Sequence, residues 1–145
     1  MKSFVLTLAL TLGSTLALAQ ANPAGLWRTI DDESKTEKSL VRITEAAGVF
    51  TGKVEKITDP AKQDSKCDKC SDARKDQKVI GMTIVQGVKK VEGEAYFGGG
   101  EILDPNDGKT YKVRMTPKDG GKTLEVRGYF GAPLLGRTQV WQRVE

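Results

Sequence analysis

Apolar and polar residues alternate along most of the chain beyond its first 25 residues. In the stretches 49–57, 109–116 and 124–130, apolar residues or glycine occupy every second position, and polar residues fill the positions between them. Alternation with a period of two places one face of a strand against a packed interior and the other in water, which is typical of antiparallel sheet. The pattern therefore predicts an all-β domain.

Turn residues separate the alternating stretches at intervals of roughly eight to twelve residues. The predicted strands cover residues 26–30, 40–44, 49–57, 91–97, 109–116, 124–130 and 138–144. The apolar stretch 79–88 is either a fully buried strand or a short helix. Clear turns are expected at 104–108 and 118–121, where Pro, Asn, Asp and Gly gather. About eight strands result, with at most one or two short helices.

A sheet of about eight strands leaves two open edges unless it closes or folds over on itself. Several glycines lie within or beside the predicted strands, among them Gly52, Gly93 and Gly128. Such glycines often mark the bends at which strands turn the corners of small barrels. We therefore expect a single small antiparallel β-barrel or a barrel-like sandwich.

The N-terminal segment has the features of a secretory signal peptide. Lys2 supplies a positive charge, residues 4–18 carry none, and small residues follow. The small-x-small rule allows cleavage after Ala19 or Ala21. The apolar stretch is shorter than the about 20 residues of a spanning helix. We expect a signal peptide at 1–21, a mature domain at 22–145, a periplasmic or extracellular location, and no integral membrane protein after cleavage.

Composition argues against several classes of function. The formal net charge is +4, and charges of both signs are spread along the chain, whereas nucleic-acid binders show a clustered basic face. The absence of histidine removes the usual nucleophile–base arrangements of hydrolases. Glu101 and Asp104 are the best carboxylate pair, but a glycosidase needs a large cleft around such a pair. We expect no nucleic-acid partner, no cofactor and no enzymatic activity.

The two cysteines form the motif Cys67-x-x-Cys70 inside a long polar loop at 58–78. After export into an oxidising compartment, they are expected to form a local disulfide. A thiol-redox role is the alternative, although no helix or βαβ setting surrounds the motif. A structural zinc site needs four ligands, and the chain holds two cysteines and no histidine, so we expect no metal site.

Several segments together resemble the bacterial secreted family catalogued as domain of unknown function 2147. They are Gly-Leu-Trp at 25–27, the Cys-x-x-Cys segment, Asp-Pro at 104–105 with Gly-Lys-Thr-Tyr at 108–111, and Trp-Gln-Arg at 141–143. The resemblance spans nearly the whole mature chain. It implies an exported β-barrel-like domain, and it brings no established activity, cofactor or catalytic residue.

A looser similarity connects the chain to lipocalin-like barrels, which begin with Gly-x-Trp and end with an arginine that covers the indole. Gly25 and Trp27 match the first part, and Arg143 or Arg137 matches the second. A guanidinium over a Trp face contributes about 0.5–2 kcal/mol and would connect the two ends of the chain. The similarity implies a structural role for these residues.

The function that the sequence favours is a binding module for a small apolar or amphipathic ligand. Glycine-rich strands and few large aliphatic residues on inward faces favour a partly open interior. The alternatives are an envelope structural or interaction protein with a packed interior, and, third, a thiol-redox protein that uses Cys67 and Cys70. The candidate ligand-binding residues are Trp27, Tyr96, Tyr111, Arg114, Tyr129, Arg137 and Trp141.

Overall fold

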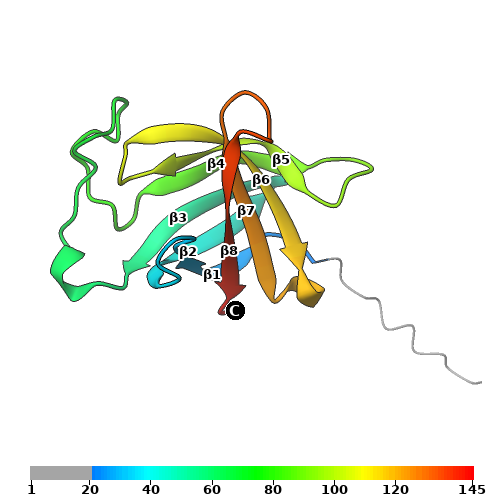
Figure 1. Ribbon diagram of the computed structural model, residues 1–145, viewed down its shortest axis with the longest axis horizontal. Helices are drawn as coiled ribbons and strands as arrows, with labels where there is room; N and C mark the ends of the chain where they lie inside the picture. The colour runs from blue at the N-terminus through cyan, green and yellow to red at the C-terminus, as the bar shows by residue number, and fades with distance from the viewer. Residues whose placement is uncertain (1–20) are drawn as a thin grey trace, which may run out of the picture.

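The computed structural model describes residues 21–145, which form a closed antiparallel β-barrel (Figure 1). Each strand pairs with the strands before and after it in the chain. The strands are β1 (Gly25–Ile30), β2 (Glu37–Ala46), β3 (Val49–Ile57), β4 (Thr83–Lys90), β5 (Phe97–Asp104), β6 (Lys109–Lys118), β7 (Thr123–Tyr129) and β8 (Gly136–Arg143). The predicted all-β barrel of eight strands is confirmed. The predicted signal peptide at 1–21 lies outside the described residues except for Ala21. The structure therefore does not bear on its cleavage after Ala19 or Ala21.

β8 returns to the first strand and closes the barrel. Trp27 pairs with Arg143, and Arg28 pairs with Gln142, in antiparallel register. Closure leaves no strand edge free to pair with another chain. Two short 3-10 turns, η1 (Pro60–Lys62) and η2 (Asp119–Gly121), are the helical elements of the described residues. No helix within residues 21–145 is long and apolar enough to cross a membrane.

The predicted strand at 91–97 is wrong: this segment is the turn between β4 and β5. Residues 92–95 are exposed, and the backbone of Gly93 has a φ of +77°. The strand begins instead at Phe97 and runs through three glycines. A Cβ at Gly100 would overlap the carbonyl oxygen of Gln86 on β4, so the close approach of β4 and β5 requires glycine. The ambiguous stretch 79–88 contains most of strand β4.

The hydrophobic core runs through the barrel, from Trp27 and Phe97 near the chain ends to Leu103 near the end of β5. Inward residues alternate with outward ones in β6, as predicted, and its Val113 and Met115 are fully buried. Phe50 and Phe97 meet edge to face, with ring centres 5.2 Å apart, a favoured geometry for aromatic pairs. These rings pack where β3 begins and β5 begins, at the end of the barrel at which both chain ends lie.

Four loops surround the other end of the barrel. They are 31–36, 58–82, 105–108 and 130–135. The longest loop, at 58–82, contains the predicted long polar segment and the disulfide between Cys67 and Cys70, which is confirmed. Both cysteines are buried. The loop packs on the turn between β5 and β6: a Cβ at Gly108 would overlap the Lys69 carbonyl. The disulfide-bonded loop therefore supports this turn.

Candidate functional site

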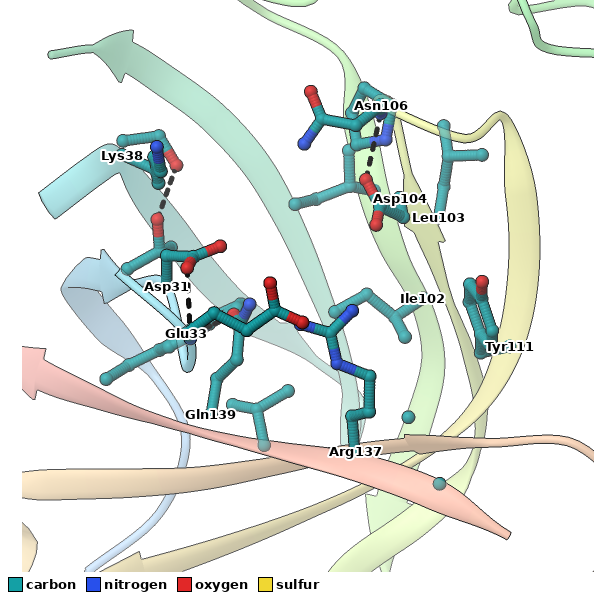
Figure 2. A pocket seen from close by; sticks show the side chains of 18 of the residues that line it. Asp31, Glu33, Lys38, Ile102, Leu103, Asp104, Asn106, Tyr111, Arg137 and Gln139 are labelled. Atoms are coloured by element: carbon teal, nitrogen blue, oxygen red, sulfur yellow. Dashed lines mark hydrogen bonds and ion pairs between the residues drawn. The ribbon is translucent and has the colours of Figure 1, made fainter. Parts of the chain in front are cut away.

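A cavity of about 620 Å³ occupies the end of the barrel that the loops surround. Strands from all around the barrel contribute to its wall, and Figure 2 shows their side chains directed into it. Its lining residues are Thr29, Asp31, Glu33, Lys38, Ser39, Ile84, Ile102, Leu103, Asp104, Pro105, Asn106, Tyr111, Val126, Gly128, Leu135, Gly136, Arg137, Gln139 and Trp141. The barrel therefore holds a cavity at its loop end, next to residues of the hydrophobic core.

Apolar side chains form the deep part of the cavity. Ile84, Val126 and Trp141 line it and also belong to the hydrophobic core. The indole N–H of Trp141 donates to Oε1 of Gln139 at 3.0 Å. The ring therefore lines the cavity without leaving a polar atom unpaired. Gly128 leaves additional space, since the nearest atom to a Cβ built there is Cβ of Tyr111 at 3.5 Å. The floor suits an apolar group.

Hydrogen bonds between side chains fix the positions of the polar groups around the mouth of the cavity. The hydroxyls of Thr29 and Ser39 lie 2.8 Å apart on neighbouring strands. The Tyr111 hydroxyl donates to Oδ2 of Asp107, and this bond raises the pKa of Tyr111 to about 12, because it stabilises the protonated phenol. Tyr111 therefore presents its ring to the cavity and directs its hydroxyl to the turn.

Arg137 lies at the mouth but already has acidic partners. Its Nε and Nη2 atoms donate to Asp32 at 3.0 and 2.5 Å, and Nη2 lies 3.5 Å from Glu33. The hydrogen bond with Arg137 lowers the pKa of Asp32, and the same bond raises the pKa of Arg137. The positive charge of Arg137 is therefore neutralised within the protein.

Asp104 ends strand β5 at the wall of the cavity. Its Oδ1 accepts the backbone N–H of Asn106 at 2.8 Å, which is the bond of a turn-forming aspartate. Among the residues that the structure describes, no cation forms an ion pair with it. Burial raises the pKa of Asp104, and the nearby charge of Asp107 adds to this effect.

Three of the seven candidate ligand-binding residues line the cavity: Tyr111, Arg137 and Trp141. Trp27 lies at the closed end, where it is buried beneath the guanidinium of Arg143. Its place there explains the Gly-x-Trp segment as part of barrel closure. The sequence left Arg143 or Arg137 as the arginine that covers the indole, and the structure assigns this position to Arg143.

The other three candidates gather away from the cavity. Arg114 lies between two aromatic rings, with its guanidinium carbon 4.3 Å from the ring centre of Tyr96 and 5.8 Å from that of Tyr129. Arg114 alternates with the inward Val113 and Met115, so it points outward. The three residues form a cation–π group on the outer surface of the barrel.

Asp104 and its neighbours are the site residues that sequence reasoning missed. From the sequence alone, Asp104 is considered as a turn former and as half of a carboxylate pair with Glu101, but not as a ligand-binding residue, and no role is assigned to Asp32 or Glu33. The considered carboxylate pair does not form at the cavity, because Glu101 is exposed and only Asp104 lines the wall. Within residues 21–145, no three His, Cys, Asp or Glu side chains come together as a metal site.

An eight-stranded up-and-down barrel with a Trp–Arg pair at its closed end and a cavity at its open end is a lipocalin-like barrel. The chain is similar to the solved structure of protein HP1028 from the human pathogen Helicobacter pylori, which is described as belonging to the lipocalin family. The TM-score is 0.74 at 24% identity, and the match covers 86% of this chain and 84% of that chain. This likeness confirms the predicted lipocalin-like fold.

The sequence itself defines a narrower group. Residues 25–143 match the family described as "Uncharacterized protein conserved in bacteria (DUF2147)", and the chain belongs to this family. The resemblance that the motifs predicted is thus confirmed over the whole barrel. No curated protein matches the chain.

Proposed function

We propose that this protein is an exported, non-enzymatic binding protein whose barrel holds a small apolar or amphipathic ligand. The cavity at the open end carries this proposal. Its volume of about 620 Å³ lies within the range of roughly 300–1,000 Å³ that is usual for small-molecule sites. An apolar floor with a few polar groups at the mouth suits a ligand with an apolar body and a polar head.

Export is part of the proposal. The disulfide of Cys67 and Cys70 fits an oxidising compartment outside the cytoplasm. N-terminal sequencing of the protein from its own cells should find Gln20 or Asn22 as the first residue. Recovery of an intact Met1 from the envelope fraction would contradict export with cleavage.

The thiol-redox alternative has little physical support. Exchange requires a thiolate to reach one of the two sulfur atoms, and both Cys67 and Cys70 are buried beneath their loop. The buried disulfide instead supports the turn at the cavity mouth. We therefore assign it a structural role in the proposal.

An interaction protein is the second candidate, and one observation favours it. The loop between β7 and β8 exposes Phe130, Leu134 and Leu135, with exposed fractions of 52%, 87% and 69%. Arg127 holds this loop by donating to the carbonyl oxygens of Pro133 and Leu134. A fixed apolar loop of this kind can mark a contact surface, but it does not account for the cavity.

A titration with the neutral fluorescent probe N-phenyl-1-naphthylamine tests the binding function. The probe should enter the cavity and gain fluorescence. Gly128→Leu should abolish this gain, because the new side chain extends into the cavity beside Tyr111 and Ile102. Lys112→Leu places the same side chain on an exposed outward position of β6 and should bind the probe like the wild type.

Circular dichroism must show that both variants keep the barrel. Probe binding that Gly128→Leu leaves unchanged would place the site elsewhere and contradict the proposal. Absence of binding to the wild type would favour the interaction protein.

A further inference from the structure

The negative charge of Asp104 has no partner within the barrel. The residue lies at the end of β5, and Figure 2 shows its carboxylate with Asn106 on one wall of the cavity, opposite Asp31 and Glu33. Oδ1 accepts the backbone N–H of Asn106. Among the residues that the structure describes, no lysine or arginine forms an ion pair with this carboxylate.

The turn between β5 and β6 does not explain why this residue is charged. The bond to the Asn106 N–H needs only a side-chain oxygen, and asparagine supplies one equally well at this turn position. An asparagine would also avoid the cost of removing a carboxylate from water. Burial at the cavity wall imposes this cost on Asp104. The charge is therefore expected to serve something other than the turn.

The two cations of the cavity lining, Arg137 and Lys38, form no ion pair with Asp104. Arg137 is bound to Asp32 and Glu33, and in Figure 2 its guanidinium points toward Glu33. Lys38 lies near Asp31, on the side of the cavity away from Asp104 (Figure 2). Asp31 stabilises its own loop, because its Oδ1 accepts hydrogen bonds from the backbone N–H groups of Glu33 and Ser34.

The same arrangement determines which ligand head fits the mouth. An anionic head would meet carboxylates on both walls, where Arg137 is already paired with Asp32 and Lys38 lies near Asp31. A cationic head would find an unpaired carboxylate next to an apolar floor, where a charge-assisted hydrogen bond is stronger than in water.

We propose that Asp104 binds the positively charged head of an amphipathic amine, whose apolar part lies on Ile102, Val126 and Trp141. This inference rests on the proposed binding function and specifies the class of ligand.

Three probes with the same twelve-carbon chain test the proposal: dodecylamine, dodecanol and dodecanoate. Each is titrated below its micelle concentration, and displacement of N-phenyl-1-naphthylamine is measured at neutral pH. Dodecylamine should bind at least about tenfold more tightly than dodecanoate. Asp104→Asn keeps the turn oxygen and should remove most of the advantage of dodecylamine over dodecanol.

Asp64→Asn is the matched control, because it removes one negative charge from an exposed loop position and should leave all three affinities unchanged. Equal or tighter binding of dodecanoate would overturn the proposal, and so would an Asp104→Asn variant that keeps the preference for the amine. In either case, binding that Gly128→Leu abolishes would still support the cavity. If neither the dye nor any of the three chains binds, the proposed function fails as well.

Discussion

The guanidinium carbon of Arg143 lies 4.3 Å from the centre of the Trp27 ring. This pair connects the last strand to the first. Arg143 also donates to the carbonyl oxygens of Gly121, Ala24 and Asn22 at 2.5, 2.7 and 2.9 Å. One side chain thus joins β8, the β6–β7 turn and the segment before β1, and it seals the closed end of the barrel.

Arg143→Ala should lower the free energy of unfolding by about 2–4 kcal/mol. The variant loses three hydrogen bonds from a charged donor and the contact with Trp27. Urea unfolding followed by tryptophan fluorescence measures the change. Arg42→Ala is the control, since Arg42 is an exposed arginine with exposed partners, and it should cost less than about 1 kcal/mol. Equal effects of the two variants would contradict the role of Arg143.

Replacing Cys67 and Cys70 by alanine should reduce stability by about 2 kcal/mol on the chain-entropy model. The barrel should still fold, because most residues of the hydrophobic core belong to the strands. The native protein should show no reactive thiol before reduction, and a thiol reagent followed by mass measurement checks this. Two freely reacting thiols in exported protein would contradict the structural disulfide.

Gly108→Ala, at the mouth of the barrel, should lower the stability of the protein more than Gly120→Ala at the closed end. Gly108 and Gly120 have φ values of +70° and +66°, but only at Gly108 would a Cβ overlap a neighbouring backbone, that of Lys69. A left-handed alanine costs roughly 1–2 kcal/mol, and the overlap adds about 1–3 kcal/mol. Gly108→Ala should also weaken probe binding, whereas Gly120→Ala should not. Thermal unfolding and probe titration compare the two variants.

Asp104→Asn should stabilise the protein at neutral pH. Burial raises the pKa of Asp104 above its ordinary value, so the folded state resists ionisation of this carboxyl, and stability falls as the pH rises through the raised pKa. Asp107 strengthens this effect and Arg137 weakens it. The gain in melting temperature should therefore be present at pH 7 and shrink near pH 3. A loss of stability at pH 7 would show that the charge serves the fold.

The alternating stretches predicted most strands correctly, because burial on one face forces a period of two. The same period of two led to the wrong prediction at 91–97. The glutamates of this segment alternate with small residues, although the segment is an exposed turn. β5 was missed because three glycines follow its first residue, Phe97, and their role depends on how closely β4 approaches. No period in the sequence reports such an approach.

The candidate site was predictable only in part. Tyr111 was assigned to the inward face of its strand, whereas Arg114 and Tyr129 fell on the polar face, where the structure places them. The pairing of Arg137 with Asp32 joins residues 105 positions apart, and it depends on how the loop 31–36 meets the start of strand β8. The unpaired charge of Asp104 could be recognised only once its surroundings were known.

Native mass spectrometry of the protein purified from the organism that makes it tests the central claim most directly. Wild-type protein should carry a reproducible small-molecule adduct, which organic solvent releases as an amphipathic compound. The Gly128→Leu variant, made and purified in the same way, should lack it. A wild-type protein that is repeatedly free of any adduct, together with a structure in which side chains fill the open end of the barrel, would contradict the account.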